Sequence, residues 1–448
     1  MAAPGRFVAR LGVVTVAAAI WRIWYVVGPV MDRIPRLGLS DEFFYNRQPR
    51  LILDGLGFAN PFLYFFQDEV APTALHPPLY SLFLTIPTAL GFESPEQHRI
   101  ANALLGAAVV ALLGLLGRRI AGDRAGIIAA ILAAVYPPLW SNDSVIGLET
   151  LYCVLVVLAL LAFYRFWSAP SFPWLAAVAV FLGLASLTRS EGVVLFALLC
   201  LPAALLAPGW STRRRVQGVG VVALVGLLIV GPWVVRNLVT FEEPTLLGTG
   251  FGLVLAYGNC DATYGGTNFG YWADECSLKD YDPDLEETEV DKLAREKGLD
   301  YIRENTRRLP VVAAARVGRI WEVFRPTQNV EFNQVYEQRG REASWAILIG
   351  FYVMLPFAIG GLVVMRKRRV PIFPMLAVAA SVTITAATGF PITRYRASFD
   401  AVATVLAAVA IDAIWRHWRA RSRADAGEPD PPEDPLDPVG VAPAEVGG

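Results

Sequence analysis

The chain has 448 residues, of which 55% are hydrophobic, and its formal net charge is −1. Soluble domains contain roughly 45 to 50% apolar residues, and nucleic-acid-binding proteins usually carry a basic excess. The composition therefore speaks against a single soluble core and against a nucleic-acid partner. The charged residues lie between long apolar runs, which is the arrangement of a multi-pass membrane protein in a lipid bilayer.

Apolar segments of the length needed to cross a membrane recur along the chain. A helix needs about 20 residues to span ~30 Å of hydrocarbon. Ten segments meet or approach this length: 9–28, 98–117, 125–141, 146–166, 172–188, 190–207, 216–234, 345–365, 370–389 and 397–416. We therefore expect an all-α polytopic membrane protein with a bundle of about ten transmembrane helices.

The short loops between these segments carry clusters of basic residues, all on one side of the membrane. The clusters are Arg6 and Arg10; Arg118, Arg119 and Arg124; Arg213 to Arg215; Arg366, Lys367, Arg368 and Arg369; and Arg416, Arg419, Arg421 and Arg423. The positive-inside rule makes this side cytoplasmic. Two long segments, 29–97 and 235–344, then lie outside, where we expect the functional site.

These boundaries divide the chain into four parts. We expect an N-terminal membrane module at 1–234 that includes the first outer loop at 29–97, an extracytoplasmic insert at 235–344, C-terminal membrane helices at 345–416 and a cytoplasmic tail at 417–448. The tail is rich in proline and acidic residues, which predicts disorder. The 77–92 run contains Pro87 and would invert every later loop if it were a span, so we expect it to be re-entrant or interfacial.

The insert is predicted to be small and mostly helical. LEETEVDKLAREKGLDYIREN has opposite charges at i, i+4, and VVAAARVGRIWEVF reads as an amphipathic helix with Arg316 and Arg319 on one side, suited to a membrane surface. Cys260 and Cys276 flank a polar stretch at a spacing that suits a loop disulfide. Such a bridge requires an oxidising compartment.

Acidic residues mark the outer face in two places. Asp41 and Glu42 follow the first span in LSDEFFYN, where a carboxylate can act as a general base or bind a divalent cation. A solvated loop start is the alternative. His76, in TALHPPLY, stands where the chain returns to the membrane and is either a supporting site residue or structural. Asp143 and Glu149 form a second acidic site near the outer ends of two spans.

Asp143 and a further charged pair also have a structural interpretation. Asp143 suits a helix cap in the SND sequence, and Arg189 and Glu191 in SLTRSEG suit a mutual ion pair. A divalent cation bridging Asp41 and Asp143 is a further alternative; no other cofactor is indicated.

Basic residues also reach the outer boundary, against the positive-inside trend. Arg236 ends the seventh span, and Arg394 and Arg396 open the tenth, with Tyr395 between them as a supporting residue. Arginine binds phosphate through two parallel hydrogen bonds. These residues therefore predict a phosphate-bearing lipid ligand, with snorkelling to lipid headgroups as the alternative.

Several stretches resemble one family in their order along the chain. SDEFFYN, ALHPPLYSLFL, HRIANALLGAAVVALLGLLGRRIAGDRAG, SLTRSEGVVLF, GPWVVRN and ITRYRASFD are similar to the series found in GT-C glycosyltransferases of the protein-mannosyltransferase and lipid A aminoarabinose-transferase type. The resemblance covers most of residues 1–415. It implies a GT-C-like bundle and a membrane enzyme that uses a polyprenyl-phosphate sugar with inversion.

The resemblance also assigns roles to particular residues. It matches the catalytic carboxylate to Asp41, with Glu42 completing the pair, and the second acidic position to Asp143. It matches the donor-phosphate arginines to Arg394 and Arg396, and less closely to Arg236.

The expected acceptor is a hydroxyl on a glycan, lipid or protein. The expected location is a bacterial plasma membrane with an extracytoplasmic active site, serving the cell envelope. A transporter of polyprenyl-linked sugars is the alternative function.

Overall fold

The computed structural model describes residues 4–30, 40–278, 282, 285–389 and 391–425, and in these ranges the protein is built from helices. The described residues contain no strand, and the one isolated β-bridge joins Ala59 to Pro72 in the first loop. The expected all-α class is therefore confirmed.

Six helices of the described chain are long and apolar enough to cross a membrane. They are α1 (Pro4–Tyr25, continued by a π-helix at Val26–Val30), α5 (Pro95–Ala121), α8 (Glu149–Ser168), α11 (Thr212–Thr240), α17 (Arg341–Lys367) and α19 (Ala397–Asp425). The pair α6 (Asp123–Val135) and α7 (Pro137–Asp143) bends by 58° between its parts and makes a seventh span only if both parts cross the membrane as one. Pro137 explains the break, because proline disfavours helical geometry in the residue before it.

Three of the ten predicted spans are shorter than expected. They form α9 (Phe172–Ser186), α10 (Gly192–Leu205) and α18 (Phe373–Thr388), of 15, 14 and 16 residues. At 1.5 Å per residue these helices fall short of ~30 Å of hydrocarbon. All ten apolar segments are thus helical, but the structure does not establish ten full spans.

The bundle has a buried centre and a surface that suits lipid. The span containing α19 is 83% buried and packs against α17, α5, α6 and α8, whereas the α11 span is 17% buried. On α11, Leu224, Leu227 and Leu228 are each more than half exposed. Apolar side chains on an exposed helix face are stable in lipid but not in water, so this surface confirms a multi-pass membrane protein.

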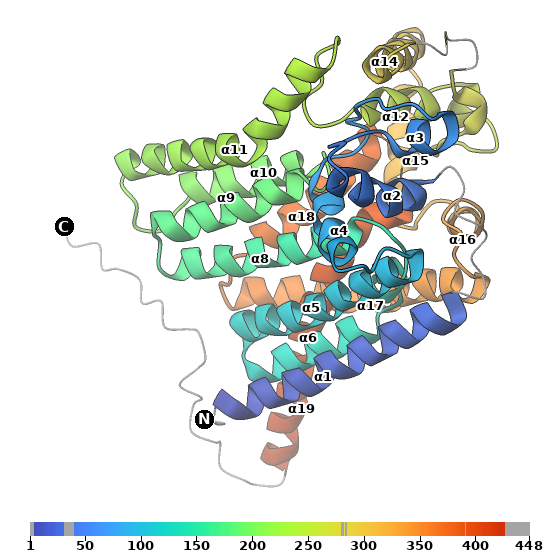
Figure 1. Cartoon of the computed structure of the whole chain (residues 1–448). Coiled ribbons are helices and arrows are strands. Elements are labelled where there is room, and N and C mark those ends of the chain that lie inside the picture. The colour runs from blue at the N-terminus through green and yellow to red at the C-terminus, as the bar shows by residue number, and fades with distance from the viewer. Residues whose placement is uncertain (1–3, 31–39, 279–281, 283–284, 390, 426–448) are drawn as a thin grey trace.

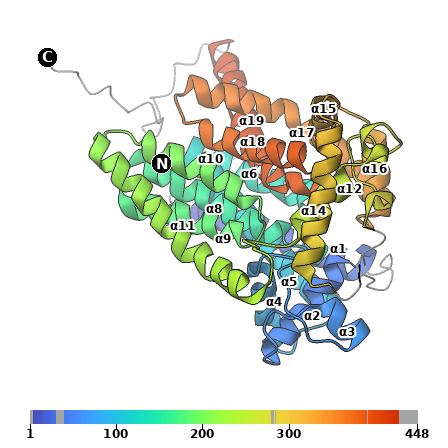
Figure 2. The same ribbon diagram turned by 90° about the horizontal axis from the view of Figure 1, so that it is seen from above.

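The remaining elements gather at one end of the bundle (Figures 1 and 2). The first loop forms α2 (Asp41–Leu53), α3 (Pro61–Gln67) and α4 (Leu79–Ala89). The insert forms α12 (Gly250–Gly258), α13 (Asp261–Tyr264), α14 (Glu287–Glu304), α15 (Leu309–Ile320) and α16 (Pro326–Val335), with a 3-10 turn at Asp274–Cys276. With 11 residues, α4 is too short to cross the membrane, as predicted for the 77–92 run.

The arginine-rich ends of the helices meet at the opposite end of the bundle. Arg118, at the end of α5, lies 4.3 Å from the ring centroid of Phe7 near the start of α1. Arg124 pairs with Asp412 of α19, and Arg416 donates a hydrogen bond to the Ala121 carbonyl. The basic clusters that predicted a cytoplasmic face therefore lie together, away from the first loop and the insert (Figure 1).

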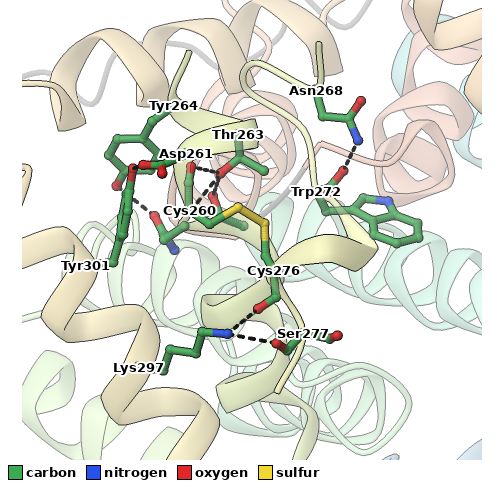
Figure 3. The surroundings of a disulfide bond; sticks show 12 residues. Cys260, Asp261, Thr263, Tyr264, Asn268, Trp272, Cys276, Ser277, Lys297 and Tyr301 are labelled. Atoms are coloured by element: carbon green, nitrogen blue, oxygen red, sulfur yellow. Dashed lines mark hydrogen bonds between the residues drawn. A yellow bond between two sulfur atoms is a disulfide. The ribbon is translucent and has the colours of Figure 1, made fainter. Parts of the chain in front are cut away.

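The insert confirms its predicted helices and disulfide but corrects the placement of two arginines. Cys260 and Cys276 are bridged, with 5.8 Å between their Cα atoms (Figure 3). In α15, Arg316 and Arg319 are buried rather than facing a membrane surface. Arg316 donates to the Gly258 carbonyl and Arg319 to the Phe269 carbonyl, at 2.5 and 2.8 Å. This face of α15 packs inward because the two guanidinium groups donate hydrogen bonds to backbone carbonyls of the insert itself.

The boundary of the C-terminal tail also needs correction. Helix α19 continues through Asp425, so residues 417–425 of the predicted disordered tail are helical. The rest of the predicted tail, 426–448, lies outside the described residues. The extension carries Arg419, whose guanidinium lies 3.9 Å from the ring centroid of Trp415 and supports the last turns.

Candidate active site

The candidate site begins at the first residue of α2, where Asp41 follows the capping residue Ser40. The Ser40 Oγ accepts a hydrogen bond from the Phe43 backbone N–H at 3.4 Å, which fixes the start of the helix. The Asp41 side chain is 41% exposed, and its Oδ2 accepts a 2.7 Å hydrogen bond from Arg394 Nη2. Two of the predicted site residues, 353 positions apart, are therefore in direct contact.

His76 completes this contact from the loop that leads into α4. Its Nε2 lies 3.6 Å from Asp41 Oδ1. The imidazole packs against the rings of Phe44 and Tyr45, with ring centroids 4.9 Å away in both cases. Because α2 supplies both aromatic rings and Asp41, the same helix sets the position of the carboxylate and of the histidine.

Arg394 is surrounded by carboxylates from three other parts of the chain. While its Nη2 contacts Asp41, its Nε lies 3.3 Å from Glu337 Oε2 and 3.7 Å from Glu149 Oε1. Arg394 belongs to the 3-10 turn Thr393–Arg396 that leads into α19. Its guanidinium is therefore occupied in this structure, and an incoming phosphate would compete with carboxylates for it.

A second arginine links the neighbouring acids. Glu149 is the first residue of α8, and its Oε1 accepts a 2.8 Å hydrogen bond from Arg189 Nη1. Arg189 Nη2 donates to Glu191 at 2.9 Å, so the predicted ion pair of these two residues is present. The Arg189 guanidinium also lies 4.2 Å from the ring centroid of Tyr395, which brings Tyr395 into the site.

The surroundings of Asp41 determine its protonation state. Burial raises the pKa of the Asp41 carboxyl, but Arg394 and His76 act in the opposite direction and prevail, so this pKa lies well below its ordinary value. Asp41 is therefore ionised at physiological pH. While Arg394 holds it, the same stabilisation makes it a weak base.

Glu42 has a different role from its neighbour. Its Oε2 accepts a 2.5 Å hydrogen bond from Arg99 of α5, and its Oε1 accepts one from the Ile146 backbone N–H at 2.9 Å. These contacts tie the start of α2 to α5 and to the loop before α8. Glu42 thereby helps to position Asp41.

Two cavities meet at the Asp41–Arg394 pair. The larger has a volume of about 960 Å³ and the smaller about 130 Å³, and Asp41, Gly147 and Arg394 line both. The larger cavity extends between α10, α12 and α18, where Val194, Phe251, Val254 and other apolar residues line it. The smaller one is lined by Tyr25, Arg99, Ser141, Glu337, Arg339 and others. The Asp41–Arg394 pair thus forms part of the wall between two compartments.

Arg396 does not belong to this site. It is fully buried, its Nε lies 3.2 Å from Asp400 Oδ1, and its Nη1 donates to the Ile320 carbonyl at 2.5 Å. It lines neither cavity. The prediction that Arg396 binds phosphate is corrected because its charge is neutralised inside the bundle.

Arg236 is also turned away from the cavities. Its Nη1 donates to the Thr73 carbonyl at 3.0 Å and to Asn237 Oδ1 at 2.9 Å, and its guanidinium lies 5.0 Å from the Trp233 ring centroid. It therefore supports the loop that carries His76, and its predicted phosphate contact is corrected.

The second acidic site is divided by the structure. The buried Asp143 ends α7, where its carboxylate accepts hydrogen bonds from Arg22 at 2.6 Å and Thr150 at 2.7 Å. It caps no helix N-terminus and lines neither cavity, so the expected cap is corrected and Asp143 is paired with Arg22 rather than facing the cavities that Asp41 lines. Among the described residues, no group of three or more His, Cys, Asp or Glu is arranged to hold a metal ion.

Sequence reasoning missed three residues around this site. Glu337 contacts Arg394, and Arg339 donates to Ser141 Oγ at 2.8 Å and to Asn142. Both lie in the segment before α17, where no motif marked them. Arg22, the partner of Asp143, had a signal: a charged residue inside an apolar span is costly unless it is paired.

Comparisons with known proteins agree with this architecture. A model of the family described as dolichyl-phosphate-mannose-protein mannosyltransferase matches residues 75–235, which include His76, Glu149 and Arg189. No curated protein sequence matches the chain significantly.

The comparison with solved structures returns proteins from Archaeoglobus fulgidus and Cupriavidus metallidurans. The oligosaccharyltransferase of Archaeoglobus fulgidus in the apo form has 15% identity and a TM-score of 0.53 over 94% of this chain and 52% of that one. Its complex with an inhibitory peptide and a dolichol-phosphate has 14% identity, the same TM-score and the same coverage. ArnT from Cupriavidus metallidurans bound to undecaprenyl phosphate has 17% identity and a TM-score of 0.40 over 94% and 81%.

The helical bundle and these comparisons define a class for the chain. It is a multi-pass membrane protein with a GT-C-like fold, as the resemblance implied. Residues 75–235 are similar to the mannosyltransferase family whose model matches them. The chain spans about half the length of the oligosaccharyltransferase, so activity, substrates and partners are matters for proposal.

Proposed function

We propose that the protein is an integral-membrane glycosyltransferase that moves a sugar from a polyprenyl-phosphate donor to an acceptor hydroxyl. The observation that carries this proposal is the contact between Asp41 and Arg394 at the meeting point of two cavities. A base and a phosphate ligand lie side by side there, as transfer between a lipid phosphate and a hydroxyl requires.

The two cavities suit the two substrates. The larger has an apolar wall that includes Leu247, Phe251 and Val254, and a charged end at Asp41, Arg189 and Arg394, which fits a lipid tail that ends in a phosphate. The smaller one opens on the other side of Asp41 and would admit the acceptor hydroxyl on a glycan, lipid or protein.

The reaction follows from this placement. The donor phosphate takes Arg394 from Asp41, which restores the basicity of the carboxylate. The acceptor oxygen attacks the anomeric carbon and passes its proton to Asp41, while the bond from that carbon to the phosphate oxygen breaks. The phosphate leaves with the electron pair, stabilised by Arg394, and the anomeric centre inverts. The base contributes roughly 10² to 10⁴-fold, and positioning and charge neutralisation supply the rest.

We further propose that the site faces the outside of a bacterial plasma membrane. The disulfide Cys260–Cys276 requires an oxidising compartment, and the arginine-rich helix ends lie at the opposite end of the bundle. Mannose is the first sugar to test, because the matching family model is named for it.

The test is transfer from a panel of radiolabelled polyprenyl-phosphate hexoses and pentoses in membranes that contain the protein. Asp41→Asn should reduce transfer at least a hundredfold without unfolding the protein, because an amide cannot accept the proton. Asp54→Asn is the matched control, since Asp54 caps the far end of the same helix and pairs with the exposed Arg50. If Asp41→Asn keeps more than half of the activity, the base assignment is wrong.

The same assay addresses the two remaining alternatives. A divalent cation at Asp41 remains a proposal, and full transfer in excess chelator would contradict it. A transporter of polyprenyl-linked sugars would move the donor with no product and no dependence on Asp41. The match to a transferase family favours the enzyme.

A further inference from the structure

The insert contributes a wall of the larger cavity that the proposed reaction leaves unused. Tyr257 of α12, Trp272, Asp274, and Asp291 and Arg295 of α14 line the same cavity as Asp41 and Arg394. These residues combine aromatic rings with carboxylates, whereas Leu247, Phe251 and Val254, also of the insert, line the cavity with apolar side chains. The insert therefore presents both an apolar part and an aromatic, acidic part to the cavity.

The segment that carries Trp272 is fixed from several directions. The disulfide joins Cys276 to Cys260 after the end of α12, and Lys297 Nζ donates to the carbonyls of Cys276 and Ser277 at 2.9 and 2.8 Å (Figure 3). Asn268 Nδ2 donates to the Trp272 carbonyl at 2.9 Å (Figure 3). The backbone at Trp272 is thereby held between anchors on both sides.

Further contacts hold the Trp272 ring and the neighbouring residue Ala273. The Ala273 N–H donates to the Tyr257 carbonyl at 3.1 Å. The ring centroid of Trp272 lies 4.5 Å from that of Tyr336, a residue that lines the smaller cavity. Trp272 and Tyr336 thus lie between the two cavities, as Asp41 and Arg394 do. Pre-positioned side chains bind a ligand at a lower entropic cost than mobile ones.

Asp291 is fixed equally firmly on the neighbouring helix. It is 7% exposed, and its Oδ1 accepts a 2.7 Å hydrogen bond from the Gly252 backbone N–H. A Cβ at Gly252 would lie 1.9 Å from the Asp291 carbonyl oxygen, so α12 and α14 touch through their backbones here. Burial raises the pKa of Asp291 to about 6. Burial of a carboxyl at a cavity wall is costly unless a ligand or a fixed donor forms hydrogen bonds with it.

We infer that Trp272, Asp274 and Asp291 form a sugar-recognition wall that contacts the sugar of the lipid-linked donor. A sugar ring presents C–H groups, which pack against an aromatic face, and hydroxyl groups, which donate to carboxylates. With the phosphate at Arg394 and the lipid tail beside the apolar residues of α12, this wall offers both kinds of contact to the sugar. This inference rests on the proposed function and adds the residues that select the sugar.

The experiment compares two ligands that differ only in the sugar. Binding of a polyprenyl phosphate, and of the same lipid phosphate carrying a hexose, is measured on purified protein for the wild type, Trp272→Leu and Asp274→Asn. Both variants should weaken binding of the sugar-bearing lipid about tenfold and leave the sugar-free lipid unchanged. Asp300→Asn is the control, because Asp300 lies on α14 in an exposed pair with Arg303. It should change neither.

The outcomes separate this inference from the proposed function. Equal loss for both lipids would show that Trp272 and Asp274 only maintain the fold, and no loss for either would show that they do not contact the donor. Either result overturns the inference while leaving transfer and its dependence on Asp41 intact. Asp274→Asn, at an exposed residue, keeps the test available if Trp272→Leu unfolds. Absence of transfer in the wild type would instead contradict the proposed function.

Discussion

Arg394 and Asp41 restrain each other in this structure. Three carboxylates surround the arginine, and the arginine in turn keeps Asp41 ionised but weakly basic. A phosphate that displaces Asp41 from Arg394 would therefore activate the base at the moment when the donor is bound.

This relationship predicts a change in pH dependence. The pKa of Asp41 is lowered in the folded protein, so the carboxylate stays ionised as pH falls through its ordinary pKa. The stability that it confers is full above that pKa and is lost only at strongly acidic pH. Wild-type kcat/KM should therefore show no loss from Asp41 protonation above about pH 5. In Arg394→Gln, burial is opposed less strongly, so the pKa rises and activity should fall on the acidic side.

The comparison of pH–rate profiles checks this prediction by their shape rather than their height. Arg394→Gln will also lower the overall rate, on the order of 10²-fold or more, because it removes a phosphate ligand. Arg50→Gln, on the exposed end of α2, should keep the wild-type profile. An unchanged profile in Arg394→Gln would contradict the coupling between Arg394 and Asp41.

Asp291 gives a second prediction, on stability. Its pKa of about 6 lies above that of an unfolded aspartate, so the native state binds the proton more tightly. Its contribution is full below about pH 4 and is lost as pH rises through about 6. Asp291→Asn can still accept from the Gly252 N–H and should raise the free energy of unfolding by on the order of 1 kcal/mol at pH 7. Thermal unfolding of both proteins at pH 4, 6 and 7.5 measures this, and equal slopes with pH would refute it.

At the scale of elements, one side chain joins the insert to the loop of His76. Glu287 begins α14, and its carboxylate accepts hydrogen bonds from Thr73 Oγ1 at 2.6 Å, the Ala74 N–H at 2.9 Å and Thr249 Oγ1 at 2.6 Å. Arg236 holds the Thr73 carbonyl from the other side. The loop before His76 is thus positioned by the insert and by the end of α11.

We expect Glu287→Ala to lower transfer at least tenfold, because it leaves several donors unpaired at about 1–3 kcal/mol each and releases the His76 loop. Glu243→Ala is the matched control: Glu243 also ties α14 to the segment after α11, through a partly exposed pair with Lys292 at 2.7 Å. If Glu287 acts through His76, its effect should largely disappear in a His76→Gln background. Additive effects in this double-mutant cycle would contradict that route.

At the scale of the whole molecule, the bundle separates two chemically distinct ends. The site, the insert and its disulfide occupy one end, and the arginine-rich loops occupy the other (Figure 1). Long apolar faces such as that of α11 cover the side between them. Under the proposed function, the lipid tail of the donor would lie in the membrane beside these faces.

The separation predicts the result of labelling intact cells with a membrane-impermeant maleimide. Cys260 and Cys276 should react only after treatment with an impermeant reductant, because they are bridged on the outer side. Cys153 and Cys200 are buried and should not react. Arg214→Cys, in the first turn of α11 at the other end, should react only after permeabilisation. Labelling of Arg214→Cys in intact cells would reverse the orientation.

The apolar segments, the basic loops and the outer acids follow from the sequence because they depend on local composition. Transfer of about 20 apolar residues into lipid is favourable wherever they occur, so ten segments could be placed and all ten are helical. Asp41, His76 and Arg394 could be chosen because they are charged or polar residues at the predicted outer boundary of the membrane. The disulfide followed from spacing across one loop.

Only the tertiary structure decided which charges pair. Arg394 and Arg396 lie two residues apart in the same motif, yet one faces the cavities and the other is neutralised in the core by Asp400. Their partners come from distant segments, as Arg22 does for Asp143 and Glu337 for Arg394. Hydropathy reports the free energy of leaving water, whereas an ion pair depends on which side chains the packed helices bring within a few ångströms.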